Sequence, residues 1–91
     1  MSTLNTVPNL YPIYKSIIDV KANDDYTLQI EFDHNEKKIL DMQPYLNLGR
    51  FKELKSKEKF KEICVSFDSI EWKNGLDLDP EFVYEKSIKI E

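Results

Sequence analysis

The sequence of 91 residues contains one cysteine, one histidine and two glycines. A structural zinc site needs four thiolate or imidazole ligands, which one cysteine and one histidine cannot supply. A lone cysteine cannot form an intramolecular disulfide, and it favours a reducing compartment. The glycines, Gly49 and Gly75, do not occur in the G-x-x-x-x-G-K pattern that cradles phosphates. Zinc-stabilised, disulfide-stabilised and phosphate-loop proteins are therefore not expected.

Long apolar runs are missing as well. A helix that spans a bilayer needs about 18 to 20 consecutive apolar residues, and no run in this sequence approaches that length. Residues 1–14 lack both the charged region and the apolar region of a signal peptide. We therefore expect no membrane role and a cytoplasmic location.

Positive charge is scarce, since 13 basic residues face 17 acidic ones and the net charge is −4 at pH 7. Binding to nucleic acid depends on lysines and arginines that displace counterions from phosphates, so direct nucleic-acid binding is not expected. The charge is also uneven, because residues 50–62 hold six basic and three acidic side chains, whereas residues 68–91 hold seven acidic and three basic ones. The acidic C-terminal third would attract a basic partner.

The composition that remains is typical of one folded domain, with 41% hydrophobic and 33% charged residues. Prolines and polar spacers predict an extended N-terminal arm over residues 1–12, followed by a single domain over residues 13–91. Alternating apolar residues predict strands over 14–22, 26–32, 38–42, 63–67 and 70–72. Polar turns over 23–25, 33–36 and 68–69 would join them as a meander and a hairpin.

Helical spacing of apolar residues begins after Pro44 and predicts two short helices before residue 63, the second capped by Ser56. A further helix is predicted to begin at Pro80, because Asp79 can accept a free amide of the first turn. We therefore predict an α+β fold, a small antiparallel sheet of about five strands with short helices packed on one face.

The stretch W-K-N-G-L-D-L-D-P-E-F-V-Y, residues 72–84, crowds three carboxylates into thirteen residues. A calcium loop would need a glycine at its sixth position, where counting from Asp77 places Phe82, and a glutamate at its twelfth. A turn that leads into a helix explains the stretch better. No metal and no cofactor are therefore expected.

Catalytic constellations are equally sparse. Nucleophilic catalysis would need Cys64 or a serine beside a base, yet His34, the one histidine, falls in a predicted hairpin loop. Asp77 and Asp79 are suited in principle to acid–base work, but the sequence shows no pocket around them. We therefore do not expect an enzyme.

The order of five short motifs resembles the small bacterial family known as domain of unknown function 2442, over about residues 12–87. The motifs are D-Y-T-L-Q-I-E-F, K-K-I-L-D-M, F-K-E-L-K, K-F-K-E-I-C-V and I-E-W-K-N-G-L-D-L-D-P-E-F-V-Y. The last of them contains the tail W-x-N-G-x-D-x-x-P-x-x-x-Y, although Lys73 stands where the family usually has proline.

This resemblance implies an accessory domain, since members stand alone, are fused to a helix-turn-helix, or lie beside a small toxin-like protein. We expect a non-catalytic protein-binding module, and more specifically the antitoxin-like member of a two-gene toxin-antitoxin cassette that masks a small, basic, toxin-like protein. The alternative is a transcription-associated accessory domain that acts with a DNA-binding chain. The oligomeric state stays open.

The expected docking patch starts from aromatic residues at the margins of the predicted segments. Tyr11, Tyr14 and Trp72 occupy such positions, and we expect them to be partly exposed. Tyrosine and tryptophan are enriched among the residues that carry most binding energy. With Asn74 and Asp77 they form the predicted binding set. The alternative for Trp72 is that it covers the open end of a small core.

Overall fold

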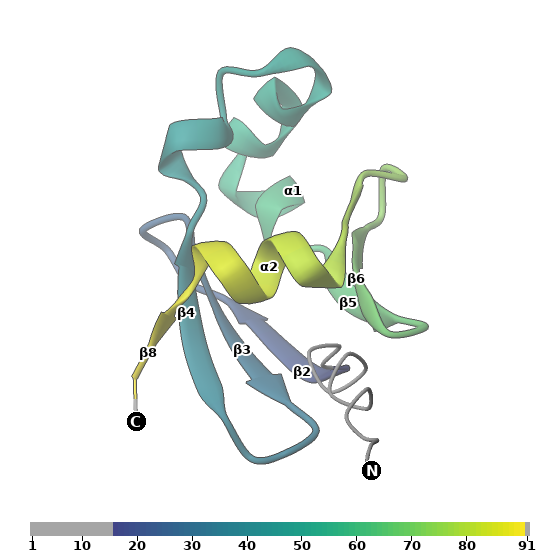
Figure 1. Cartoon of the computed structure of the whole chain (residues 1–91). Coiled ribbons are helices and arrows are strands. Elements are labelled where there is room, and N and C mark those ends of the chain that lie inside the picture. Colours follow the sequence, from purple (N-terminus) through teal and green to yellow (C-terminus); the bar gives the residue numbers. More distant parts are fainter. Residues whose placement is uncertain (1–15, 91) are drawn as a thin grey trace, which may run out of the picture.

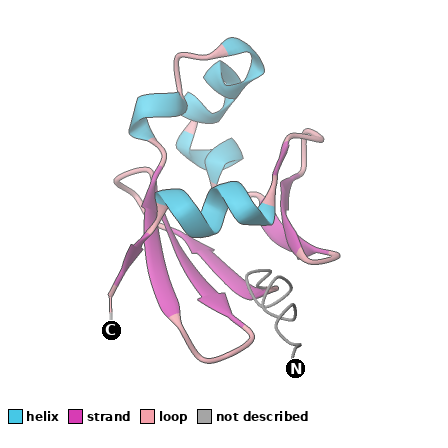
Figure 2. Ribbon diagram, viewed as in Figure 1, coloured by secondary structure: helices cyan, strands magenta, loops and turns pink. Residues whose placement is uncertain are grey.

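The computed structural model describes residues 16–90 (Figure 1). The predicted arm over residues 1–12 lies outside this range, together with Tyr11 and Tyr14. Within the described range the strands form two antiparallel sheets, one of four strands and one of three. Helices lie on one side of them (Figure 2).

The strands of the larger sheet are, in order across it, β2 (Ile17–Ala22), β3 (Thr27–Phe32), β4 (Lys37–Asp41) and β8 (Ile88–Lys89). Those of the smaller sheet are β5 (Ile63–Ser66), β6 (Ser69–Trp72) and β7 (Asp77–Leu78). The helical elements are the 3₁₀ helices η2 (Gln43–Tyr45) and η3 (Gly49–Lys55) and the α-helices α1 (Lys57–Phe60) and α2 (Pro80–Lys86).

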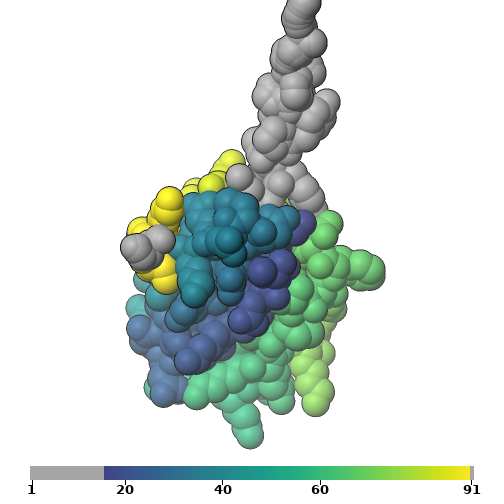
Figure 3. Space-filling model, turned by 90° about the horizontal axis from the view of Figure 1, so that it is seen from below, coloured from purple at the N-terminus to yellow at the C-terminus, as the bar shows by residue number. Residues whose placement is uncertain are grey.

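The α+β class, with antiparallel strands and short helices, is confirmed. The strands number more than the predicted five because β7 and β8 have two residues each, too few to show an alternating pattern. The helix α2 runs from the end of the smaller sheet across to β8 and so connects the two sheets (Figure 1). Seen from below, β2 lies beside the β5–β6 hairpin (Figure 3).

The strand β3 follows its sequence pattern closely. Leu28, Ile30 and Phe32 are completely buried, and the residues between them face the other side of the sheet. Alternation over residues 38–42 predicts that Lys38, Leu40 and Met42 share one face. This is confirmed, since Leu40 and Met42 are buried and Lys38 is only 8% exposed. Strict alternation over four or more residues is therefore a sufficient signal for the central strands.

The strand β2 departs from simple alternation. A register irregularity between Ile17 and Asp19 places Ile17 opposite Phe32 in the core, while Ile18 is 52% exposed. Simple alternation over residues 14–22 predicts Ile18 with Val20 on one face and Ile17 with Asp19 on the other, and this is wrong for the first residues of the strand. A bulge inserts one extra residue and moves the side chains before it to the opposite face.

The turn between β5 and β6 is shifted by one residue from its predicted place. Ser66 pairs with Ser69, so Phe67 and Asp68 form a two-residue loop. Such loops favour positive φ, and Phe67 has a φ of 56°. Alternation over residues 63–67 predicts that Phe67 shares one face with Ile63 and Val65. This is wrong, because Ile63 and Val65 pack against the core whereas the Phe67 side chain is 99% exposed.

Between residues 43 and 60 the structure has η2, η3 and α1 where two helices were predicted. The predicted caps are confirmed: the Ser56 hydroxyl accepts a hydrogen bond from the Lys59 amide at 3.3 Å. At the start of α2, the Asp79 carboxylate accepts one from the Glu81 amide at 3.1 Å. Pro80 is the first residue of α2, where no amide is lost.

We expect Asp79→Ala to lower the free energy of unfolding by about 0.5 to 2 kcal/mol, because it removes the capping carboxylate of α2. The measurement is urea unfolding of the wild type and the variant. Asp77→Ala is the matched control, since Asp77 is exposed and caps no helix, and it should leave the midpoint nearly unchanged. Equal midpoints for Asp79→Ala and the wild type would contradict the capping role.

Candidate functional site

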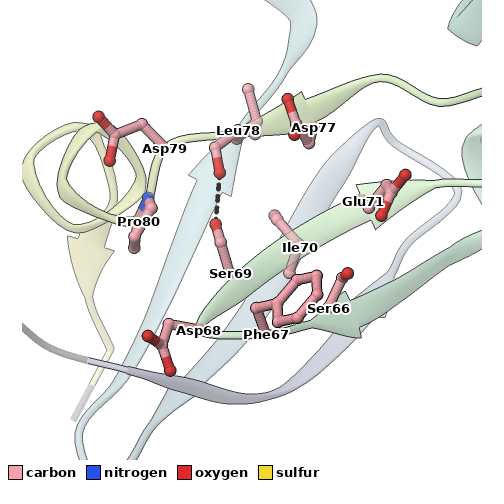
Figure 4. Close-up of a pocket in the computed structure, with 10 residues that line it drawn as sticks. All are labelled: Ser66, Phe67, Asp68, Ser69, Ile70, Glu71, Asp77, Leu78, Asp79 and Pro80. Carbon is pink, nitrogen blue, oxygen red and sulfur yellow. Dashed lines mark hydrogen bonds between the residues drawn. The ribbon is translucent and has the colours of Figure 1, made fainter.

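Two surface depressions flank β7. The first, which we call the cleft, has a volume of about 530 Å³ and lies between the β5–β6 turn and the start of α2 (Figure 4). Its lining combines apolar side chains such as Phe67 and Ile70 with the carboxylates of Asp68 and Glu71. The Ser69 hydroxyl donates a hydrogen bond to the Leu78 carbonyl and so ties β6 to β7 inside it.

The second depression, which we call the apolar groove, has a volume of about 500 Å³. Its lining residues belong to η2, η3, β7 and α2 or directly precede one of these elements. They are Met42, Tyr45, Leu48, Phe51, Asp77, Leu78, Asp79 and Phe82. The rings of Tyr45 and Phe82 meet edge to face with their centroids 5.4 Å apart. Leu48, at 56% exposure, presents a large apolar side chain to solvent. The volume falls within the range of about 300 to 1,000 Å³ usual for small-molecule pockets, so the volume by itself does not indicate a protein ligand.

Asp77, Leu78 and Asp79 line both depressions and therefore form the wall between them, which we call the acidic ridge. Both aspartates are exposed. The ion pairs among residues 16–90 involve neither of them. Two carboxylates without a cationic partner thus stand beside an apolar surface. This combination suits a ligand that is both apolar and positively charged.

The structure corrects the prediction for Trp72. Its side chain is 1% exposed, its ring contacts Phe60 and Phe51, and its Nε1 donates a hydrogen bond to the Phe60 carbonyl at 2.9 Å. A partner cannot reach it, so the expectation that Trp72 is partly exposed is wrong. The alternative, that this residue completes the core, is correct. Tyr11 and Tyr14 lie outside the described residues.

Asn74 links the β6–β7 turn to η3 through hydrogen bonds. Its Nδ2 donates a hydrogen bond to Glu53 Oε1 at 2.8 Å, and its Oδ1 accepts one from the Leu76 amide at 3.1 Å. Arg50 donates to the Asn74 carbonyl at 2.8 Å. The hydrogen bond from Asn74, assisted by Arg50, holds the pKa of Glu53 below its ordinary value. These contacts join the β6–β7 turn to η3 and thereby fix one side of the groove.

Of the predicted binding residues in the described part of the chain, Asp77 is the one that lines the groove. Sequence reasoning missed Tyr45, Leu48, Phe51 and Phe82. Their apolar character at helical spacing is a signal that a buried core and an open groove share. The sequence does not distinguish a buried core from an open groove, because the difference depends on how β7 and α2 pack around these side chains.

A separate polar network joins α2 to the β3–β4 hairpin. The Tyr84 hydroxyl donates to Glu36 Oε1 at 2.9 Å, and His34 Nε2 lies 2.6 Å from the same oxygen. Lys38 Nζ donates to the Tyr84 carbonyl at 2.5 Å and lies 3.6 Å from the centroid of the Tyr84 ring. His34, predicted to be a solvated loop residue, therefore also contacts Glu36. The network holds the C-terminal half of α2 on the sheet.

The same contacts shift three pKa values. The hydrogen bond with His34 is the main reason that the pKa of Glu36 lies below its ordinary value of 4.5, and Tyr84 and Lys38 act in the same direction. Burial lowers the pKa of Lys38. Donation to Glu36 raises the pKa of Tyr84. The folded protein thus prefers an ionised Glu36.

We expect Glu36→Gln to weaken the acid sensitivity of the fold. A carboxyl whose pKa is lower in the folded state stabilises the protein above its unfolded pKa of about 4.5, and this contribution disappears as the pH falls through the folded pKa. The stability difference between wild type and variant should therefore shrink between about pH 6 and about pH 3.5. Urea unfolding at both pH values tests this. A difference that does not change with pH would contradict the assignment.

The fold and the site together define a small α+β domain with an open apolar groove beside an acidic ridge. Residues 17–89 match the model of a family described as "Protein of unknown function (DUF2442)". The chain therefore belongs to this family, as its motifs predicted. The match runs from β2 to β8 and includes the groove, the ridge and the cleft. No curated protein and no solved structure matches the chain.

Two further observations bear on the kind of site. Among residues 16–90, no three or more His, Cys, Asp or Glu side chains gather in a way that could hold a metal ion. In the same part of the chain, no helix has both the length and the apolar character needed to cross a membrane.

Proposed function

We propose that this DUF2442 domain is a non-catalytic protein-binding module, and that it acts as the antitoxin-like member of a two-gene pair by covering a small basic protein. The observation that carries the proposal is the apolar groove beside the acidic ridge. Burial of apolar surface supplies most of the driving force of association. Carboxylates at the rim select a basic partner and speed the encounter.

The exposure of the residues around the groove supports a protein rather than a small molecule as the ligand. The groove is open, and its exposed Leu48 and Asp77 project where an extended surface can contact them. A stable protein interface covers about 800 Å² on each partner, so the contact must extend beyond the groove onto the ridge and the neighbouring surface. Both proteins would act in a reducing cytoplasm, where the exposed thiol of Cys64 stays free.

The test is co-expression of the domain with the product of the adjacent gene, followed by affinity purification. We expect the two proteins to co-purify, the complex to weaken at high salt, and the domain to relieve any growth defect that the partner causes alone. Salt dependence is expected because exposed charges are screened beyond about 10 Å at 0.1 M salt. Failure of every neighbouring gene product to bind would contradict the antitoxin-like role.

A further inference from the structure

The acidic ridge is also a sheet edge. The strand β7 is last in the order β5-β6-β7 and pairs with β6 alone among the described strands. The Trp72 amide donates to the Leu76 carbonyl at 2.7 Å, and the Ser69 hydroxyl donates to the Leu78 carbonyl, so the carbonyls of Leu76 and Leu78 both point toward β6. Backbone groups of successive residues alternate in direction along a strand. The amide and carbonyl of Asp77 therefore point away from β6, toward the open edge.

The side chains on this edge differ in chemistry from one side of the ridge to the other. Toward the groove lie the rings of Tyr45 and Phe82, whose edge-to-face contact leaves apolar surface open to a further ring or aliphatic chain. At the ridge itself, Asp79 Oδ1 is occupied by the Glu81 amide. Of the two aspartates on the ridge, Asp77 is the one whose carboxylate has no ion pair and no side-chain hydrogen bond with the described residues.

We propose that β7 receives an extended basic segment of the partner protein as an added strand. The segment pairs with the backbone of Asp77, buries one large apolar side chain in the groove, and places a neighbouring arginine or lysine against the Asp77 carboxylate. Neighbouring side chains of a strand point to opposite sides. In the added strand, an apolar residue can therefore enter the groove while the basic residue next to it contacts the Asp77 carboxylate. Strand addition of this kind draws affinity from the backbone and specificity from alternate side chains.

This inference rests on the proposed function for the identity of the partner, but a synthetic peptide tests it without the partner. The probe is acetyl-Arg-Phe-Arg-Phe-Arg-amide, added at millimolar concentration to the ¹⁵N-labelled full chain. Matched control peptides replace all arginines by glutamate or all phenylalanines by serine. The measurements are amide chemical shifts and amide hydrogen exchange.

We expect the basic aromatic peptide to cause saturable shifts at Leu48, Leu78 and Phe82 and to slow hydrogen exchange at the Asp77 amide. Neither control peptide should do so. Asp77→Asn should weaken the peptide about fivefold, because it removes the unpaired charge and keeps the shape. Equal shifts with the acidic peptide, or shifts without protection of the Asp77 amide, would overturn the strand-addition mode.

The two proposals fail separately. If the peptide does not bind while the neighbouring gene product co-purifies, the binding module stands and the docking mode on β7 is wrong. If the peptide binds as described while no neighbouring product co-purifies, the docking mode stands and the antitoxin-like role is wrong.

Discussion

Trp72→Ala should lower the free energy of unfolding by about 3 to 5 kcal/mol, the range for removal of a large buried aromatic side chain. The ring is 1% exposed, packs against Phe60 and Phe51, and donates a buried hydrogen bond to the Phe60 carbonyl. Truncation would leave a cavity and an unpaired carbonyl. A total stability of about 0.05 to 0.15 kcal/mol per residue amounts to about 5 to 14 kcal/mol for 91 residues, so this loss is between about a fifth and all of the total.

Urea unfolding measures this loss directly, and Trp72 provides its own probe because it is the one tryptophan of the chain. The wild type should show the blue-shifted emission of a buried indole, which moves to longer wavelength on unfolding. Phe67→Ala is the matched aromatic control, and it should cost little because Phe67 is 99% exposed. A loss for Trp72→Ala no larger than for Phe67→Ala would show that Trp72 is not part of the core.

Leu48→Asp should weaken binding of the partner protein by about 2 kcal/mol or more, close to thirtyfold, if Leu48 is an anchor of the interface. The substitution removes an apolar side chain at the groove margin and adds a charge there. The fold should remain intact, because Leu48 is already 56% exposed. Isothermal titration of the co-purified partner is the measurement.

Ile88→Asp is the control for the loss of any exposed apolar residue. Ile88 is 70% exposed on β8 and does not line the groove, so its replacement should leave partner affinity unchanged. Unchanged affinity for Leu48→Asp, in a protein with wild-type stability, would remove the groove from the interface.

The sequence predicted the elements whose signals are local. Alternation identified β3, and hydrogen-bonding side chains at Ser56 and Asp79 marked two helix starts, because each signal depends on neighbours within four residues. The bulge at Ile17 escaped prediction, since it depends on the pairing of β2 with β3. The exposed position of Phe67 was not predicted for a similar reason. The register of β5 and β6 places Phe67 in the turn with a positive φ, although aromatic residues usually favour strands.

The candidate site was predicted less well than the fold. The tail W-x-N-G-x-D-x-x-P-x-x-x-Y combines residues with separate roles that only the packed structure distinguishes. Trp72 fills the core, Asn74 braces the β6–β7 turn, Pro80 begins α2, and Tyr84 joins the network at the other end of that helix. Asp77 is left with an exposed carboxylate at the groove. The groove itself depends on the spacing between η2, β7 and α2, which no local pattern specifies.

The central claim is that the apolar groove and the acidic ridge contact the partner protein. The most direct measurement is the change in amide signals of the ¹⁵N-labelled chain when the co-purified partner is added. We predict the largest changes at Leu48, Asp77 and Phe82, and little change at Lys21 and Gln29, which are exposed on the larger sheet. Changes centred on Lys21 and Gln29, with Leu48, Asp77 and Phe82 unaffected, would contradict the claim.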